Sequence, residues 1–217
     1  KGKYLIDLYN KAQTPLTWHK HIFKRSKEKG ILCFSSVFDE LSFDFLESIN
    51  VPAYKIASFE NNHFPLIDKV ASTKKPVIIS TGLAEFNDLK EIINIFVKRK
   101  NNNYCFLKCT SNYPANLTDL NLNSITKLKN EFGCAIGLSD HTISDIAAIT
   151  SIGLGARVFE KHVKLDNKVK TLDSEFSLDI KNFEKYIKNV NLAFSSIGNE
   201  NILISKNEKK SKMFKRS

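Results

Sequence analysis

Short apolar runs in this sequence end in side chains that could do chemistry. Six such ends carry hydroxyl, lysine, carboxylate or imidazole groups: Ser35-Ser36, Lys55 and Ser58 with Glu60, Ser80-Thr81-Gly82, Thr110-Ser111, Ser139-Asp140-His141 and Glu160-Lys161-His162. Hydroxyls and lysines are donors for phosphates and carboxylates. If the six ends lie on one rim, they predict a site for an anionic small molecule.

Two of the five histidines, His141 and His162, stand at the ends of consecutive runs. In a parallel sheet such positions are neighbours. Neighbouring imidazoles could bind a divalent ion such as Mn²⁺ or Mg²⁺, with water and substrate oxygens completing the coordination. The alternative is that each histidine only satisfies a hydrogen bond at a strand end. His19, His21 and His63 are interpreted as surface or packing residues.

Lys55 and Lys161 each allow more than one interpretation. Anion binding is favoured for Lys55, because Ser58 and Glu60 follow it closely and make a polar neighbourhood suited to a charged substrate. A Schiff base with a carbonyl substrate is the second interpretation, although such a lysine works best in an apolar pocket that lowers its pKa. A structural ion pair with a carboxylate is the third.

These groups must be positioned by the alternation of short apolar runs with longer amphipathic stretches, which is typical of βα units around a parallel sheet. Strands are expected over residues 31–35, 53–57, 76–80, 104–109, 135–138 and 157–161. Helices are expected over residues 15–29, 40–49, 65–71, 86–98, 123–132, 144–154 and 179–197.

This pattern predicts an α/β fold of the TIM-type (β/α)₈ barrel, with six of the eight βα units present. No Gly-x-Gly-x-x-Gly turn follows any run, which argues against a dinucleotide-binding sheet. A barrel carries its active groups at the C-terminal ends of its strands, where the polar residues gather here. An open sheet of six strands also fits the pattern.

Composition narrows the class of protein. Of the 217 residues, 42% are hydrophobic and 26% charged, as in an ordinary globular protein. Residues 206–217 hold six Lys or Arg and one Glu, so half of the net charge of +10 lies there, and we expect no nucleic-acid partner for the body. No apolar run approaches the roughly 20 residues that span a bilayer, and the first residues lack the order of a signal peptide. No membrane contact and a cytoplasmic location are expected.

The four cysteines, Cys33, Cys105, Cys109 and Cys134, lie in or beside apolar runs. This placement favours reduced core thiols over a disulfide framework. Cys105 and Cys109 share one face of an expected strand, but no further metal ligands are found near them.

The run ends form longer motifs: Phe34-Ser35-Ser36-Val37-Phe38-Asp39, Val51-Pro52-Ala53-Tyr54-Lys55-Ile56-Ala57-Ser58, Lys75-Pro76-Val77-Ile78-Ile79-Ser80-Thr81-Gly82, Cys109-Thr110-Ser111-Asn112-Tyr113-Pro114, Gly137-Leu138-Ser139-Asp140-His141-Thr142 and Phe159-Glu160-Lys161-His162. In order and spacing they resemble the sialic acid synthase family. Two stretches resemble its pseudaminic acid synthase branch: Tyr9, Ala12, Thr14-Pro15-Leu16 and Trp18-His19, and Leu172-Asp173-Ser174-Glu175-Phe176-Ser177.

The resemblance implies a metal-dependent condensation of phosphoenolpyruvate with an open-chain amino sugar, 2,4-diacetamido-2,4,6-trideoxy-altrose, to give pseudaminic acid and phosphate. It implies metal ligands at His141 and His162, phosphoenolpyruvate contacts from Lys55, Ser58, Ser80, Thr81, Ser111 and Ser139, and catalytic groups at Glu60, Lys55 and Glu160. Ser111 stands where a neighbouring family pattern often has Asn. Phe38, Tyr113 and Asp173 match positions that line the sugar pocket, although the two rings could equally pack the rim.

The chain also departs from the family pattern. The first two barrel strands are missing, so residues 1–198 are expected to form a partial barrel. Residues 199–217 resemble the linker to a C-terminal antifreeze-like domain, which implies a homodimer for the whole enzyme. One alternative is an N-acetylneuraminate or legionaminic acid synthase with the same chemistry, and another is a Schiff-base aldolase acting through Lys55 or Lys161. Two non-catalytic alternatives are an inactive truncated remnant and a basic module that binds polyanions through its tail, residues 209–216.

Overall fold

A six-stranded parallel half-barrel forms the centre of the molecule. The computed structural model describes residues 7, 10, 12–168 and 170–216, and within them the strands follow one another in the order β1-β2-β3-β4-β5-β6. Each strand therefore pairs with the strand that precedes it in the sequence. The bounds are β1 Ser35–Ser36, β2 Tyr54–Ile56, β3 Val77–Ser80, β4 Tyr104–Cys109, β5 Ala135–Asp140 and β6 Val158–Lys161.

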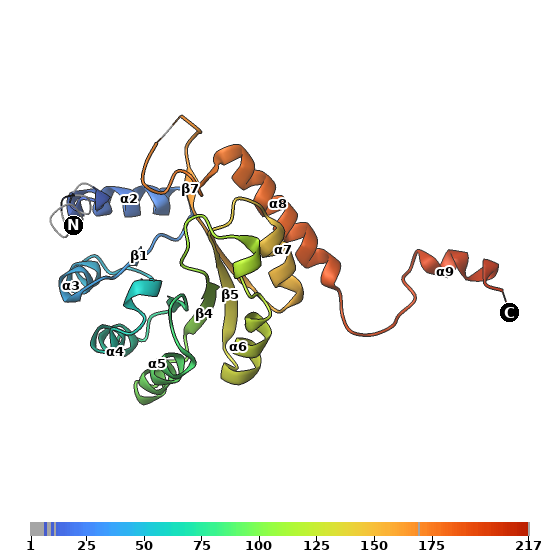
Figure 1. The fold of residues 1–217 in the computed structure, drawn as a ribbon, viewed down its shortest axis with the longest axis horizontal. Helices are drawn as coiled ribbons and strands as arrows, with labels where there is room; N and C mark the ends of the chain where they lie inside the picture. Colours follow the sequence, from blue (N-terminus) through green and yellow to red (C-terminus); the bar gives the residue numbers. More distant parts are fainter. Residues whose placement is uncertain (1–6, 8–9, 11, 169, 217) are drawn as a thin grey trace.

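Helices cover the outside of this sheet in an arc that begins with α2 and ends with α8 (Figure 1). Short 3₁₀ turns at Ser58–Glu60 and Leu117–Asp119 lie in the loops that follow β2 and β4. The helices are α2 Leu16–Glu28, α3 Glu40–Ser48, α4 Phe64–Ser72, α5 Phe86–Lys98, α6 Ser124–Phe132, α7 Ile146–Gly153 and α8 Ile180–Ile197.

Local signals set where two of these helices begin. Asp39 accepts a hydrogen bond from the backbone N–H of Ser42 at 2.7 Å, and the Ser42 hydroxyl in turn accepts from the backbone of Asp39. This reciprocal capping box fixes the first turn of α3. Asp179 caps α8 by accepting from the backbone N–H of Asn182 at 2.9 Å.

The hydrophobic core lies between the sheet and the helix arc. β2 contributes Tyr54 and Ile56 to this core, and β3 contributes Val77 and Ile79. Because successive side chains of a strand point to opposite faces, Lys55 between Tyr54 and Ile56 points to the inner face. The same alternation places Ser80, Ser139 and Glu160 on the inner face.

One predicted strand is wrong in all but its last residue. A strand was expected over residues 31–35, but only Ser35 and Ser36 pair with β2, opposite Tyr54 and Lys55. Tyr54 is where β2 begins, so β2 offers no partner to the backbone before Ser35. Ile31 and Leu32 are accordingly exposed.

Two further features were not expected from the sequence. β7 Val163–Lys164 and β8 Leu178–Asp179 pair as a small second sheet, and residues 165–168 and 170–177 lie between them without forming a helix or strand. The segment after α8, predicted to be a linker, leaves the body and carries a short helix, α9 Glu208–Ser211, followed by a 3₁₀ turn over Lys212–Phe214 (Figure 1).

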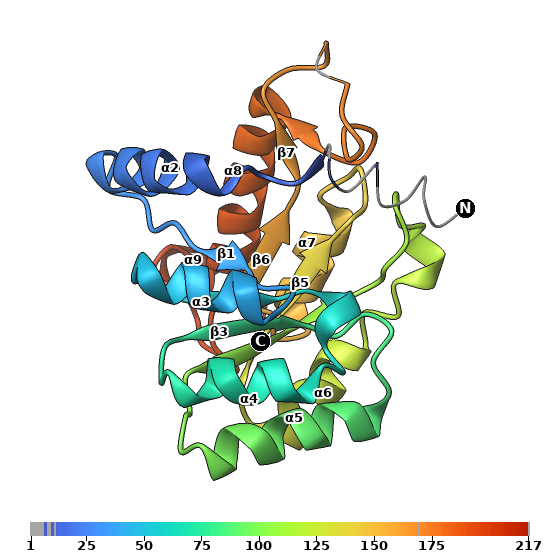
Figure 2. The ribbon, with the colours of Figure 1, turned by 90° about the vertical axis from the view of Figure 1, so that its left-hand side faces the viewer.

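The expected boundaries at residues 198 and 199 stay predictions. Tyr9, which contributed to the resemblance, lies outside the described residues, as do residues 1–6 and Ser217. None of the helices in the described part of the chain is long and apolar enough to cross a bilayer. Figure 2 shows the half-barrel from the side, with α3, α4 and α5 outside the strands.

Candidate active site

A cavity of about 500 Å³ opens at the C-terminal ends of the strands. This is the rim where a barrel carries its chemistry. Ten of the predicted site residues line the cavity: Phe38, Lys55, Ser58, Ser80, Tyr113, Ser139, His141, Glu160, His162 and Asp173. Glu60, Thr81 and Ser111 do not line it directly. A second cavity, of about 430 Å³ beside α8 and the β7–β8 sheet, contains none of the predicted residues.

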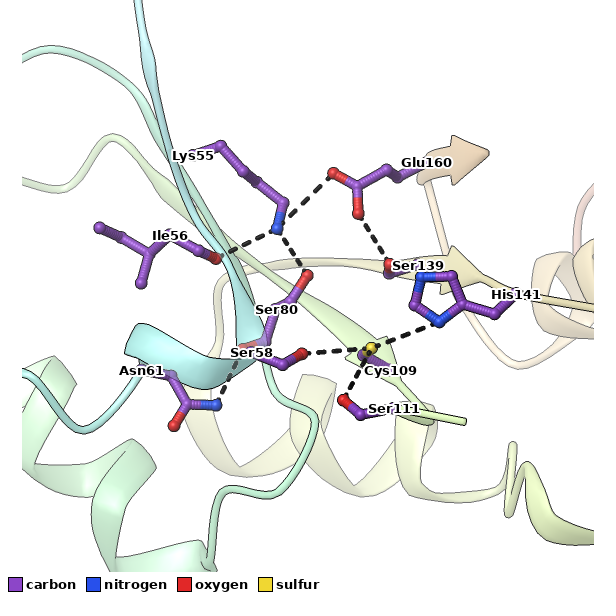
Figure 3. Close-up of polar contacts among 10 residues, drawn as sticks. All are labelled: Lys55, Ile56, Ser58, Asn61, Ser80, Cys109, Ser111, Ser139, His141 and Glu160. Atoms are coloured by element: carbon purple, nitrogen blue, oxygen red, sulfur yellow. Dashed lines mark hydrogen bonds and ion pairs between the residues drawn. The ribbon is translucent and has the colours of Figure 1, made fainter. Parts of the chain in front are cut away.

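Lys55 is the charged centre of the cavity. Its side chain is buried, and Nζ donates to Ser80 Oγ at 2.8 Å and to the Ile56 carbonyl at 3.1 Å, as Figure 3 shows. Glu160 Oε2 lies 3.6 Å from Nζ. Burial lowers the pKa of Lys55, and the nearby Glu160 carboxylate offsets part of that effect. The ammonium group is thus held in place by neutral oxygens and one partly exposed carboxylate, which leaves it able to bind an anion.

Glu160 also connects Lys55 to the next polar group. The Ser139 hydroxyl donates to Glu160 Oε1 at 2.7 Å, and Ser139 and Glu160 face each other in the β5–β6 ladder. One carboxylate therefore orients a hydroxyl with one oxygen and faces an ammonium with the other (Figure 3). This arrangement brings together three predicted residues that come from β2, β5 and β6.

Hydroxyl groups crowd around Gly82 in the loop after β3. A Cβ added at Gly82 would lie 2.1 Å from Ser111 Oγ and 2.6 Å from Ser58 Oγ. Only glycine fits there, and two hydroxyls converge on its backbone. Ser111, which does not line the cavity, therefore still belongs to this hydroxyl cluster.

A buried amide holds the same loop. Asn61 Nδ2 donates to the carbonyl of Ser80 at 3.1 Å and to the carbonyl of Gly82 at 2.8 Å. These two carbonyls flank Thr81, so a single side chain fixes the backbone that carries the Ser80 hydroxyl. Sequence reasoning missed Asn61 because it lies directly after the 3₁₀ turn Ser58–Glu60, in a segment with no periodic signal.

Cys109 is the other residue that sequence reasoning missed. It was interpreted as a core thiol, yet it lines the cavity. Its Sγ atom lies 3.3 Å from Ser58 Oγ, 3.8 Å from Ser111 Oγ and 4.0 Å from His141 Nδ1. Burial alone would raise its pKa, but these neighbours, His141 first, lower it to about 7. Cys105, on the same strand without such neighbours, has a pKa raised to about 11 by burial. All four cysteines are free, as predicted.

His141 and His162 are neighbours, as the strand-end pattern predicted. Their ring centroids are 5.3 Å apart. His141 Nδ1 lies 3.1 Å from the Thr110 carbonyl oxygen. Because a carbonyl only accepts, Nδ1 carries the hydrogen, and the lone pair of Nε2 is left free. His162 Nδ1 lies 3.6 Å from Asp173 Oδ2.

The two imidazoles differ in how readily they take up a proton. Burial works against protonation of His141, but the contacts with Cys109 and the Thr110 carbonyl outweigh it, and its pKa is raised. The pKa of His162 is lowered, first by burial and then by the neighbouring His141. A neutral His162 keeps a lone pair available for a metal ion.

This donor set fits a divalent transition metal whose other ligands come from water and substrate. Two imidazoles suit a first-row metal such as Mn²⁺ better than Mg²⁺, which prefers oxygen ligands. Among the described residues there is no group of three or more His, Cys, Asp or Glu side chains that would complete a site alone. His141 and His162 are thus the two protein ligands that the geometry offers.

Aromatic rings form one wall beside the histidines. The Tyr113 ring lies 4.4 Å from that of His141 and 5.1 Å from that of Phe176, measured between centroids. Phe176 also contacts His162 at 4.9 Å. Phe38 lines the cavity with 60% of its surface exposed, so it is a rim residue with room for a ligand. Both predicted rings therefore line the rim of the cavity, and contact with a sugar stays a prediction.

Glu60 lies behind the cavity rather than in it. Its Oε2 atom is buried without a hydrogen-bond partner, and burial raises its pKa although Lys55 lies near enough to lower it. Lys161 differs from Lys55, because its Nζ pairs with Asp140 at 3.2 Å and both side chains are buried. That pairing tells against Lys161 as a Schiff-base nucleophile.

The chain is similar to known proteins over most of its length. A model of the NeuB family matches residues 1–202. Pseudaminic acid synthases from Campylobacter jejuni and Helicobacter pylori are 42% and 40% identical to the chain, each over 98% of its length, and the chain spans 62% and 63% of those relatives. The structure of N-acetylneuraminic acid (sialic acid) synthetase from Leptospira borgpetersenii in complex with citrate superposes with a TM-score of 0.92 at 28% identity, covering 99% of this chain and 75% of that one.

The match to the family model covers most of the chain, and the Campylobacter jejuni relative aligns with 98% of the chain. The chain therefore belongs to the NeuB family and is related to the sialic acid synthases.

Proposed function

We propose that the whole protein condenses phosphoenolpyruvate with an open-chain amino sugar to form a nonulosonic acid and phosphate. The observation that carries the proposal is the convergence, in one cavity, of an anion-binding group and a histidine pair. Lys55, Ser80 and Ser139 supply donors for phosphate and carboxylate, and His141 and His162 lie across the same cavity.

The chain's own residues take defined roles in this reaction. Lys55 and the hydroxyls of Ser58, Ser80 and Ser139 bind the phosphate and carboxylate of phosphoenolpyruvate. Its C3 then attacks the aldehyde carbon of the sugar, water adds at C2, and phosphate leaves. Glu160, which faces Lys55 and Ser139, moves protons next to C2. Thr81, in the loop after β3, and Ser111, whose hydroxyl lies beside Gly82 from the loop after β4, support the anion site.

The sugar occupies the aromatic end of the cavity. Tyr113 and Phe38 form its walls, and Asp173, beside His162, accepts hydrogen bonds from its hydroxyl or amide groups. A divalent ion held by His141 and His162 would polarise the aldehyde oxygen and orient the sugar. Glu60, buried and with a raised pKa, is in position to hold a proton behind Lys55.

The proposed sugar is the precursor of pseudaminic acid, 2,4-diacetamido-2,4,6-trideoxy-altrose. The support is the 42% and 40% identity to proteins named pseudaminic acid synthase. We further propose that two more βα units close the barrel in the whole protein and that it acts as a homodimer. The exposed Ile31 and Leu32 beside β1 are consistent with an edge that another element covers.

The test uses the full-length protein with phosphoenolpyruvate, Mn²⁺ and each of three amino sugars, the precursors of pseudaminic, legionaminic and N-acetylneuraminic acids. Phosphate release with the first sugar, lost when a chelator removes the metal, supports the proposal. Phosphate release only with another sugar supports the proposed condensation but shows that the proposed sugar is wrong. No release with any of the three contradicts it, and borohydride trapping of the substrate on Lys55 would favour the Schiff-base alternative.

A further inference from the structure

A buried ion pair lies directly beneath the two histidines. Asp140 and Lys161 face each other in the β5–β6 ladder, and Asp140 Oδ2 lies 3.2 Å from Lys161 Nζ. The two side chains are 0% and 2% exposed. Asp140 directly precedes His141 in the chain, and Lys161 directly precedes His162. The pair therefore connects the two strands at the positions directly before the two histidines.

The pair also holds the backbone on the far side of His141. Asp140 Oδ1 accepts from the Thr142 backbone N–H at 2.9 Å and from the Thr142 hydroxyl at 2.8 Å. Lys161 Nζ donates to the Thr142 carbonyl. His141 thus sits between two residues that the same ion pair fixes, and its own Nδ1 is held by the Thr110 carbonyl.

A residue of helix α8 also contacts the Asp140–Lys161 pair. Tyr186, in α8, donates its hydroxyl hydrogen to Asp140 Oδ2 at 3.3 Å, and Lys161 Nζ lies 5.6 Å from the centroid of the Tyr186 ring. Lys161 borders the cavity, but its ammonium group is occupied by Asp140 and Thr142. Both charged side chains therefore serve other protein groups rather than a ligand.

Stability alone does not account for such a pair. Burying two charges costs several kcal/mol in desolvation, and apolar residues of similar size often do as well or better by ~1–4 kcal/mol. Apolar side chains make no directional contacts. The ion pair and its hydrogen bonds do, and they fix both the register of the two strand ends and the backbone conformation around His141. Groups that orient metal ligands in this way typically change metal affinity by ~10–100-fold when removed.

We propose that Asp140 and Lys161 are positioning residues that set the spacing and orientation of His141 and His162 for one divalent ion. Neither touches the ion or the substrate. The inference rests on the proposed function, because it takes the two histidines to be metal ligands. Ser139 and Glu160 also connect the two strands, but their side chains lie in the cavity, whereas the Asp140–Lys161 pair holds the backbone next to each histidine.

The test is Mn²⁺ binding to the full-length protein, measured by electron paramagnetic resonance without any substrate. The informative variant combines Asp140→Asn with Lys161→Met. Asn keeps an acceptor for Thr142 and can donate to the Tyr186 oxygen, so the charges leave without creating an unpaired buried charge. A folded double variant should bind Mn²⁺ about 10–100-fold more weakly than the natural protein.

The chain offers a closely matched control. Lys75 pairs with Glu47 at 2.6 Å, Tyr54 donates its hydroxyl to the same carboxylate, and Lys75 Nζ lies 5.7 Å from the Tyr54 ring centroid. This second lysine–carboxylate–tyrosine group lies away from the cavity. Glu47→Gln combined with Lys75→Met should leave the Mn²⁺ affinity unchanged, whatever it does to the melting temperature.

Each outcome decides something different. If the natural protein binds no Mn²⁺, the proposed metal site fails and the inference fails with it. If the natural protein binds and the folded double variant binds equally well, the inference alone is wrong. If the double variant does not fold, Tyr186→Phe, which removes only a hydroxyl, should weaken Mn²⁺ binding by at least about threefold, and an unchanged affinity would overturn the inference.

Discussion

Lys55 donates a hydrogen bond to Ser80 Oγ at 2.8 Å, although 25 residues separate them in the chain. The two side chains stand on neighbouring strands, β2 and β3, and both are buried. Their contact places an ammonium and a hydroxyl at the same point of the cavity. Four predictions follow from this geometry and its surroundings.

Lys55→Met should weaken the binding of phosphoenolpyruvate. A charge-assisted hydrogen bond contributes about 1.5–3 kcal/mol, which corresponds to about 10–150-fold in Kd. Isothermal titration calorimetry on the full-length protein measures the change. Lys108→Met is the matched control, because Lys108 is also a strand lysine, but its Nζ bonds to the Cys109 carbonyl at 3.0 Å and it does not line the cavity. Equal affinities for the Lys55 variant and the natural protein would remove Lys55 from the anion site.

Asn61→Ala should lower stability and also weaken phosphoenolpyruvate binding. Each buried carbonyl that loses its donor costs ~1–3 kcal/mol, and the loop with Ser80 and Gly82 loses its anchor. Asn101→Ala is the control, since Asn101 is equally buried and its amide bridges the carbonyls of Ala71 and Lys75 away from the cavity. Denaturant unfolding should show similar losses for both variants, and calorimetry should show weaker binding only for the first. If both bind normally, Asn61 has only a structural role.

Gly82→Ala should damage the anion site through a steric clash. The new Cβ would lie 2.1 Å from Ser111 Oγ, so the hydroxyl cluster must move. Overpacking of this kind costs ~1–3 kcal/mol. If the whole cost weakens phosphoenolpyruvate binding, its Kd increases roughly 5–150-fold. Gly153→Ala, in α7, meets nothing within 4 Å and should stabilise the fold by about 0.5–1 kcal/mol. An unchanged phosphoenolpyruvate Kd in the Gly82 variant would show that the cluster does not touch the anion.

Glu60→Gln should change how stability depends on pH. Burial raises the pKa of Glu60 above the ordinary 4.5, so the folded state holds this proton more tightly than the unfolded state. The stability that protonated Glu60 contributes is fully present below the unfolded pKa and is lost as pH rises through the folded pKa. Lys55 and His63 oppose the shift without cancelling it.

The glutamine variant has no such proton to lose. The measurement is the melting temperature of the variant minus that of the natural protein, from pH 4 upwards. This difference should increase as the pH rises toward neutrality. Asp68→Asn is the control with the opposite sign, because the hydrogen bond from Arg99 lowers the pKa of Asp68. A constant difference between the Glu60 variant and the natural protein across this range would contradict the raised pKa.

The sequence by itself predicted the alternation of strands and helices, because apolar periodicity is a local property of the chain. It also predicted that polar groups would meet, since parallel strands end on one rim. Ser139 and Glu160, opposite each other in the ladder, and the neighbouring rings of His141 and His162 confirm that expectation. Local pattern could not show that residues 31–34 would pair with no strand in the described part of the chain, because strand pairing depends on where β2 begins.

Only the tertiary structure decided which side chains share the site. Cys109 and Cys105 have the same local pattern, yet packing against Ser58 and His141 makes Cys109 a cavity residue with a lowered pKa. Lys55 and Lys161 were both candidates from sequence, and they separate because alternation along a strand turns one into the cavity and the other toward Asp140. The physical reason is that the chemistry depends on distances between side chains of different strands. Those distances are set only when the strands pair and pack against the helices.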